Sequence, residues 1–187
     1  MKIDITLKIA PKMVKDAQGN EKKALVGHLG TLFDDMNKEF PLDYMERKGI
    51  VFDVSHVQER DIEVRDIDIS QVEKGMFVAF YTGFIKNVGY GTKEYFSSHP
   101  QLSNQLIEEL LKRNISIIGV DFAGVRRDKE HTPMNQHCAK QGVFIVENLC
   151  HLESALENKN TFIVHTYPMN YANMTGLLCR VVAEINS

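Results

Sequence analysis

The chain has 187 residues, of which 43% are hydrophobic and 25% charged, and its formal net charge is -3. This is the composition of an ordinary globular protein, and the length allows a sizeable core. The absence of a basic block argues against a nucleic-acid partner, and no apolar run approaches the roughly 20 residues that span a bilayer. We therefore expect one domain over residues 1–187 with neither a nucleic-acid nor a membrane partner.

The N-terminal segment predicts a strand and a cytoplasmic location. Residues 2–9, KIDITLKI, alternate apolar and polar side chains as a half-buried strand does, and they contain no signal-peptide core. The polar stretch around Gly19 and Asn20 predicts a turn, which makes a hairpin with a following strand the expected arrangement. The three cysteines are too few and too scattered for a disulfide framework or a CxxC zinc site.

Further along the chain, apolar runs predict strands and one periodic segment predicts a helix. Residues 49–55 and 76–83 are expected to be strands. Residues 101–114, QLSNQLIEELLKRN, place leucines and isoleucines on one helical face and end at Asn114. Residues 115–121, ISIIGVD, follow at once and predict a buried parallel strand.

The remaining elements alternate between helix and strand. We expect short helices at 134–142 and 152–158, and strands at 143–148, 161–168 and 177–185. Because the first half is mostly strand and the second half alternates, the sequence predicts an α/β fold, a single domain with a mixed β-sheet and flanking helices.

Acidic residues end several of these strands. Asp34 follows an apolar segment, Asp121 ends ISIIGVD and Glu147 ends VFIVE. In open α/β sheets, sites collect at the carboxyl ends of strands, and a partly desolvated acid needs a metal, a cation or backbone N–H groups as its partner. Capping of a loop or helix explains any one of these acids equally well. Convergence of several at one edge would favour a site.

The stretch 26–40, VGHLGTLFDDMNKEF, holds the strongest candidate ligands. His28 and Asp34 stand six residues apart around Gly30 and Thr31. An imidazole nitrogen combined with a carboxylate suits Zn²⁺ or Mn²⁺. Gly30 allows a sharp turn and the Thr31 hydroxyl can brace a neighbour. The alternative is a histidine that is hydrogen-bonded rather than metallated.

HLGTLFD, at 28–34, resembles the signature HxGTHxDxPxH of the cyclase and kynurenine formamidase-like metal-dependent hydrolases. The resemblance continues in order along the chain. Its further matches are VEKGMFVAFYTGF to xxGDxVLxxTGW, YFSSHPQLS to HPxLS, IIGVDFAGV to xxGxDxxS, GVFIVENLCHL to GVxIxENLxNL, and YPMNYANMTGLLCRVVAEI to PLxxxxxxGxPxRxxA.

The resemblance implies a distinctive fold of the swivelling β/α/β type around a mixed sheet, assembled as a homodimer or homotetramer. It also implies a site for one or two divalent metal ions, Zn, Mn or Mg, and a small-molecule substrate. The family's usual chemistry is hydrolysis of an amide or related acyl bond, as in N-formylkynurenine, where a cation activates water and polarises the carbonyl.

Carried over position by position, the match is partial. His28, Asp34 and Glu147 fall on family metal ligands. Leu32 occupies the second histidine of the motif and cannot ligate. Lys38 stands where the last histidine would act as acid and base, which makes Lys38 the candidate catalytic group. Its alternatives are to neutralise Asp34 in place of a metal or to bind a substrate carboxylate.

A further family histidine, twelve residues before the glutamate, is Asn135 here. His131 lies one helical turn earlier and His137 two residues later, so either substitutes as a ligand if the helix shifts. The set His28, Asp34 and Glu147 has one imidazole and two carboxylates, which favours Mn²⁺, Mg²⁺ or Fe²⁺ over structural Zn²⁺.

Two functions remain open at this point. The first is a divergent metal-dependent hydrolase that acts on a small amide, in the manner of an arylformamidase, or on a lactone, with one weakly held metal ion. The second is a catalytically inactive family member that has lost the metal and serves as a small-molecule binding or scaffold protein.

Overall fold

The computed structural model describes residues 1–18, 28–34, 38–157, 160–171 and 175–185. Within this part of the chain, an eight-stranded sheet has the order β1-β8-β2-β6-β5-β4-β3-β7, and β7 pairs with β8 as well. The second pairing of β8 closes the sheet on itself. The strands are β1 (Lys2–Asp4), β2 (Leu32–Asp34), β3 (Glu46–Asp53), β4 (Phe77–Tyr81), β5 (Ile117–Val120), β6 (Phe144–Glu147), β7 (Thr161–Pro168) and β8 (Gly176–Glu184).

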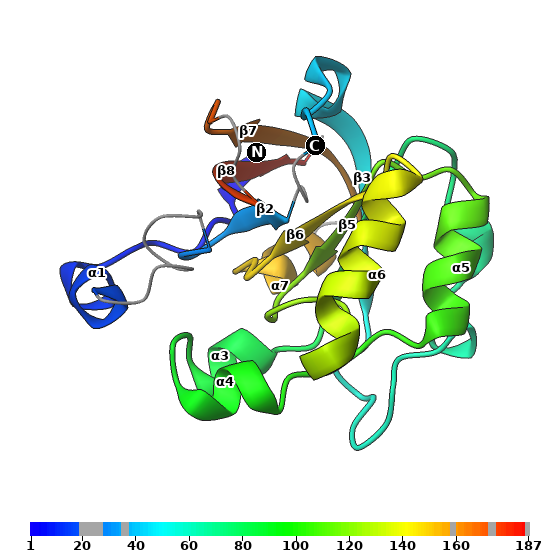
Figure 1. Cartoon of the computed structure of the whole chain (residues 1–187). Coiled ribbons are helices and arrows are strands. Elements are labelled where there is room, and N and C mark those ends of the chain that lie inside the picture. The colour runs from blue at the N-terminus through cyan, green and yellow to red at the C-terminus, as the bar shows by residue number, and fades with distance from the viewer. Residues whose placement is uncertain (19–27, 35–37, 158–159, 172–174, 186–187) are drawn as a thin grey trace.

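Strands β3, β4, β5 and β6 run parallel to one another, whereas β1, β2, β7 and β8 pair antiparallel with their neighbours. The predicted mixed sheet is therefore confirmed. Helix α6 lies across β6, and α5 lies beside α6 (Figure 1). The helices are α1 (Pro11–Ala17), α3 (Phe84–Val88), α4 (Lys93–Ser97), α5 (Asn104–Lys112), α6 (Asp128–Lys140) and α7 (Leu152–Leu156), with short 3₁₀ turns η1 (Leu42–Met45), η2 (Val64–Asp66) and η3 (Ile69–Gln71).

Each face of the sheet supports its own hydrophobic core. Ile118 and Ile145 pack with the buried leucines of α5 and with Cys138 of α6. Their neighbours along the strands, such as Ile117 and Val146, point to the other face and pack inside the closed sheet. This alternation follows from the two-residue period of a β-strand. It also determines which strand residues lie beneath α6.

Helix α5 forms where the sequence predicts it. The hydroxyl of Ser103 accepts a hydrogen bond from the Leu106 backbone N–H at 3.1 Å, which caps the N-terminus of the helix. Asn114 has a φ of 54°, the left-handed conformation that ends many helices. Leu106 and Leu110 are fully buried, as the apolar face requires.

Helix α6 begins earlier than the sequence predicts. It spans Asp128–Lys140 and includes Pro133, whereas the prediction of 134–142 began after this proline. A proline inside a helix removes a hydrogen bond, which is why the pattern favoured a later start. The longer helix brings His131 onto the same helix as Asn135. Four residues separate the two, so they share one helical face.

The N-terminal prediction is only partly correct. The strand is shorter than residues 2–9, and β1 pairs with β8 at the other end of the chain. Helix α1 occupies part of the stretch where a turn was expected. Gly19 and Asn20 of the predicted turn lie outside the described residues. None of the described helices has the length and apolar character needed to cross a bilayer.

Candidate metal centre

Two acids meet on the sheet face beneath α6. Strands β2 and β6 are antiparallel neighbours, with Leu32 opposite Glu147 and Asp34 opposite Ile145. Because residues two apart on a strand share a face, the carboxylates of Asp34 and Glu147 lie on the same side of the sheet. Both are buried, with exposed fractions of 1% and 5%. The register of two neighbouring strands therefore creates a buried pair of acids.

His131 of α6 approaches both carboxylates. Its Nε2 atom lies 3.5 Å from Asp34 Oδ2 and 3.9 Å from Glu147 Oε1. Its Nδ1 atom is 3.1 Å from the carbonyl oxygen of Arg126, which orients the ring. One potential ligand atom from each of the three side chains lies within 4.8 Å of the other two. The described residues therefore form a His-Asp-Glu cluster of the kind that holds a divalent cation.

Buried oxygen atoms without a partner surround this cluster. Asn135 donates a hydrogen bond from Nδ2 to Asp34 Oδ2 at 2.6 Å. The other oxygen of Asp34, Oδ1, is buried and has no hydrogen-bond partner, and the same is true of Glu147 Oε1 and Asn135 Oδ1. Burial of such acceptors is costly unless something satisfies them. A divalent cation held by the cluster would satisfy the two carboxylate oxygens, so the donor set fits a metal ion.

The electrostatics of the cluster also favour a positive charge. Burial raises the pKa of Glu147 above its ordinary value, and the negative charge of Asp34 adds to this rise. Burial alone would lower the pKa of His131, but the contact with Asp34 and the charge of Glu147 outweigh it and raise the pKa to about 9. Two acids in one buried space require compensation by a cation, whether an imidazolium or a metal ion.

Gly124 leaves the space that the His131 ring fills. Its φ is +103°, and a β-carbon at this position would overlap the imidazole and lie 3.1 Å from Glu147 Oε1. Any side chain at position 124 would therefore compete with the histidine for its place beside Glu147.

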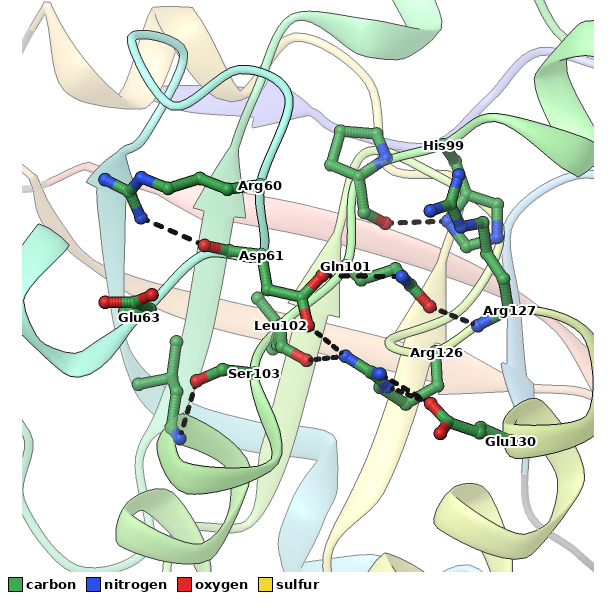
Figure 2. A network of polar contacts seen from close by, with 12 residues as sticks. Arg60, Asp61, Glu63, His99, Gln101, Leu102, Ser103, Arg126, Arg127 and Glu130 are labelled. Atoms are coloured by element: carbon green, nitrogen blue, oxygen red, sulfur yellow. Dashed lines mark hydrogen bonds and ion pairs between the residues drawn. The ribbon is translucent and has the colours of Figure 1, made fainter.

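A buried arginine anchors the chain just before α6 (Figure 2). Nη1 of Arg126 donates to Asp61 Oδ2 at 2.6 Å and to the Leu102 carbonyl at 2.9 Å, and Nε donates to Glu130 Oε2 at 2.8 Å. The Arg126 side chain is only 10% exposed. Because the Arg126 carbonyl faces His131, this anchor also helps to position the ring.

The Gly-Thr pair at the centre of the motif has a structural role. Thr31 Oγ donates to the Asn148 carbonyl at 2.8 Å and accepts from the Leu7 backbone N–H at 2.7 Å. Asn148 Nδ2 donates to the Gly30 carbonyl at 2.7 Å, and Tyr95 donates its hydroxyl to Asn148 Oδ1 at 2.7 Å. These bonds lock the start of β2 to the end of β6. Thr31 thus braces a neighbour, as the sequence predicts.

Asp34 and Glu147 come together, and His131 rather than His28 completes the cluster of the described residues. His28 Nε2 is 2.9 Å from Thr175 Oγ, and His28 is not among the three residues that form the cluster. Leu32 is 1% exposed and packs as a core residue. Lys38 is exposed and lies four residues after Asp34, the last residue of β2. Its role, and that of His28 as a ligand, stay predictions.

Of the two histidines that α6 offers, His131 faces the acids. His137 points to the surface, where Nε2 is 2.8 Å from Glu108 Oε1. Asp121 does not join the cluster either, because its carboxylate accepts hydrogen bonds from Thr82 and from the Gly83 backbone N–H. Of the three acids that end predicted strands, Asp34 and Glu147 therefore come together and Asp121 does not. The four-residue spacing of His131 and Asn135 is the sequence signal that points to the imidazole.

Comparison with known proteins places this chain in a family. A family model described as "Putative cyclase" matches residues 3–127. A solved "potential metal-dependent hydrolase with cyclase activity" has a TM-score of 0.76 and 21% identity, covering 100% of this chain and 98% of that one. A "predicted metal-dependent hydrolase from Bacillus stearothermophilus" has a TM-score of 0.71 and 20% identity, covering 98% and 97%.

Isatin hydrolase A from Labrenzia aggregata, solved with benzyl benzoate, has a TM-score of 0.74 and 16% identity, covering 100% of this chain and 94% of that one. No curated protein matches the chain. At these identities the solved structures establish a shared fold, whereas the family model covers well over half of the sequence. This chain belongs to the cyclase family, as the motifs from His28 to the C-terminal strand predicted.

Proposed function

We propose that the protein is a divergent metal-dependent hydrolase of a small amide or lactone, with a divalent cation held by Asp34, His131 and Glu147. The observation that carries this proposal is the cluster itself. Three potential ligand atoms from three different elements lie within 4.8 Å of one another. Asp34 Oδ1 and Glu147 Oε1 are buried there without partners.

The donor set favours a hard or borderline ion. Two carboxylates and one imidazole suit Mn²⁺, Mg²⁺ or Fe²⁺ better than the tetrahedral nitrogen and sulfur environments of structural Zn²⁺. When bound, such an ion supplies Lewis-acid polarisation of a carbonyl and activation of water. In this chain Arg126 fixes the orientation of the His131 ring, and Asn135 fixes that of Asp34.

Several parts of the proposal rest on the family resemblance. His28 as a further ligand and Lys38 as the acid–base group are proposed from the motif alone. The names of the structural neighbours, metal-dependent hydrolases and an isatin hydrolase, support a small-molecule substrate. We also propose a cytoplasmic homodimer or homotetramer. Tyr167, Met169 and Tyr171 are about half exposed and offer apolar surface for such an assembly.

A metal-free binding or scaffold protein is the second candidate, and two observations favour it. The positive charge of a protonated His131 lies 3.5 Å from Asp34 and 3.9 Å from Glu147, so the imidazolium can balance the buried acids without an ion. Leu32, at a family ligand position, is part of the core. Under this alternative the fold keeps the site as a structural ion pair.

Metal content and hydrolysis distinguish the two candidates. Protein purified without chelator is analysed for Mn, Fe, Mg and Zn, then loaded with each ion and assayed against N-formylkynurenine and isatin. We expect about one bound equivalent and metal-dependent turnover, both lost in Glu147→Gln. Glu108→Gln serves as the matched control, since Glu108 is a surface acid that contacts His137. A folded wild type that takes up no metal at millimolar concentration would overturn the hydrolase proposal in favour of the second candidate.

A further inference from the structure

A cavity of about 220 Å³ lies where the parallel strands of the sheet end. Its wall includes Tyr81, the last residue of β4, together with Asp121, which directly follows β5, and Cys150, which comes shortly after β6. Ile85 of α3 and Leu152 of α7 line it as well. In α/β proteins the carboxyl ends of parallel strands are where ligands bind. The position of this cavity is therefore that of a ligand site.

The cavity and the metal centre belong to different faces of β6. Ile145 packs in the core beneath α5 and α6, and Glu147, two residues later, points to the same side of the sheet. Leu149 and Leu152, which line the cavity, belong instead to the core inside the closed sheet. No residue of the described His-Asp-Glu cluster lines the cavity. It is therefore a separate site rather than an extension of the metal centre.

The wall of the cavity is mostly apolar, and part of it is aromatic. Its aliphatic and aromatic side chains are those of Leu7, Ile85, Leu149, Leu152, Tyr81 and Tyr90. Tyr90 is held in place, because its hydroxyl accepts a hydrogen bond from the Gly30 backbone N–H at 2.9 Å and its ring packs on that of Tyr95. An apolar cavity of about 150 Å³ takes up benzene. This larger cavity has room for two fused rings.

The carboxylates and the ammonium group that line the cavity already have partners. Asp121 accepts hydrogen bonds from Thr82 Oγ1 at 2.6 Å and from the Gly83 backbone N–H at 2.7 Å. Lys86 Nζ lies 3.5 Å from Glu153 Oε1, so these two opposite charges compensate each other. An ion that entered would give up its hydration without gaining an unpaired charge in return. The cavity therefore favours an uncharged ligand.

We propose that this cavity is a second ligand site, which binds an uncharged, flat aromatic molecule of about two fused rings. Such a molecule buries its apolar surface against the leucines and isoleucine of the wall and contacts the rings of Tyr81 and Tyr90. The site needs no metal ion, so the inference goes beyond the proposed function and does not depend on it.

The test uses indole as the probe, titrated by calorimetry into the full-length protein. Indole-2-carboxylate, the same ring with a negative charge, is titrated at the same pH. We expect saturable one-to-one binding of indole and at least tenfold weaker binding of the carboxylate. Cys150→Phe, which puts a ring into the cavity, should weaken indole binding at least tenfold. Gln136→Phe, the same ring at an exposed position on α6, should leave it unchanged.

The wild-type thiol provides a second measurement that needs no variant. Cys138 and Cys179 are buried, whereas Cys150 is partly exposed and lines the cavity. Bound indole should therefore slow the alkylation of Cys150 severalfold, as located by mass spectrometry. If Cys150→Phe does not fold, this protection decides.

Three results would each overturn the proposal. They are no saturable binding of indole, equal affinity for indole and its carboxylate, and a Cys150 that indole does not protect. Protein treated with chelator should bind indole as well as metal-loaded protein does. A protein that takes up indole but no metal would therefore refute the hydrolase proposal and leave this inference standing.

Discussion

Gly124 and His131 compete for one small volume beside Glu147. A β-carbon on Gly124 would overlap the Nδ1 and Cε1 atoms of the His131 ring. The glycine also has a φ of +103°, which L side chains rarely adopt. Position 124 therefore requires glycine for two reasons: its backbone conformation is strained for other residues, and the His131 ring occupies the space that a side chain would need. Only the second reason concerns the metal centre.

Substituting Gly124 should damage the centre more than the fold. We expect Gly124→Ala to lower Mn²⁺ affinity at least tenfold, because the new methyl group displaces the imidazole from the carboxylates. Gly91→Ala is the matched control: Gly91 has a φ of +97°, and a β-carbon there would meet no atom within 4 Å. Both variants carry similar backbone strain, of order 1 kcal/mol. Calorimetric titration and urea denaturation of the two variants separate metal binding from stability.

If Gly91→Ala weakened Mn²⁺ binding as much as Gly124→Ala, backbone strain rather than overlap with His131 would be responsible.

Three histidines, His28, His131 and His137, should differ in their effect on metal binding. His131→Ala is expected to lower Mn²⁺ affinity by about a hundredfold, since it removes the imidazole of the described cluster. His137→Ala should have no effect, because His137 contacts Glu108 at the surface. His28→Ala tests the motif-based assignment directly. A loss as large as that of His131→Ala would show that His28 joins the ion when it binds.

The sequence predicted correctly those helices and strands whose caps, apolar faces and ends are set by residues close together in the chain. Helix α5 has its serine cap, its apolar face and its terminal asparagine within fourteen residues. The strand that ends at Glu147 was also predicted, from a short apolar run after Gly142. In both cases the deciding residues are neighbours in sequence, so tertiary context does not alter the outcome. The grouping of Asp34 with Glu147 followed from the family motif, since the two acids are far apart in the chain.

What the sequence did not reveal depends on distant contacts. The pairing of β7 with β8 closes the sheet, and β1 pairs with β8 from the other end of the chain. No local pattern encodes such pairings. Because proline has a low helical propensity, the sequence pattern did not predict that α6 begins before Pro133. Tertiary packing overrides that propensity in the structure. Which face of α6 turns to the sheet then decides between His131 and His137. That choice is made by packing against β6 and by the Arg126 anchor, not by the helix alone.

Arg126 should contribute to both stability and metal binding. Its side chain is 10% exposed, and its guanidinium contacts Asp61, Glu130 and the Leu102 carbonyl. We expect Arg126→Met to reduce the free energy of unfolding by about 2 kcal/mol, because it leaves polar partners unsatisfied. Mn²⁺ affinity should fall as well, since the Arg126 carbonyl orients His131.

Arg65→Met provides the comparison for Arg126→Met. Arg65 pairs with Glu63, but its side chain is 69% exposed, so the loss should be near zero. Chemical denaturation measures both variants. Equal stabilities for the two would mean that the buried network of Figure 2 contributes no more than a surface ion pair.

The buried His99 should make the folded protein less stable in mild acid. Its ring is 2% exposed and stacks on Phe122, and Nδ1 lies 2.7 Å from the Pro100 carbonyl. Burial lowers the pKa of His99 to about 4, whereas a histidine of the unfolded chain titrates near pH 6.5. Between these values the unfolded state binds a proton that the folded state does not. Stability should therefore fall as the pH falls from 6.5 to 4, by at most about 3 kcal/mol.

Comparison with His99→Gln isolates this contribution. Both proteins contain His131, whose pKa is raised in the folded state, so its contribution to stability is common to the two and drops out of their difference. Glu147 has the opposite sign, since its raised pKa lets the folded state hold a proton that the unfolded state has lost. Both proteins contain Glu147, so its contribution cancels in the difference between their free energies of unfolding. Urea denaturation at pH 7, 5 and 4 should show the wild type losing its advantage as the pH falls, and a constant difference would contradict a buried neutral imidazole at position 99.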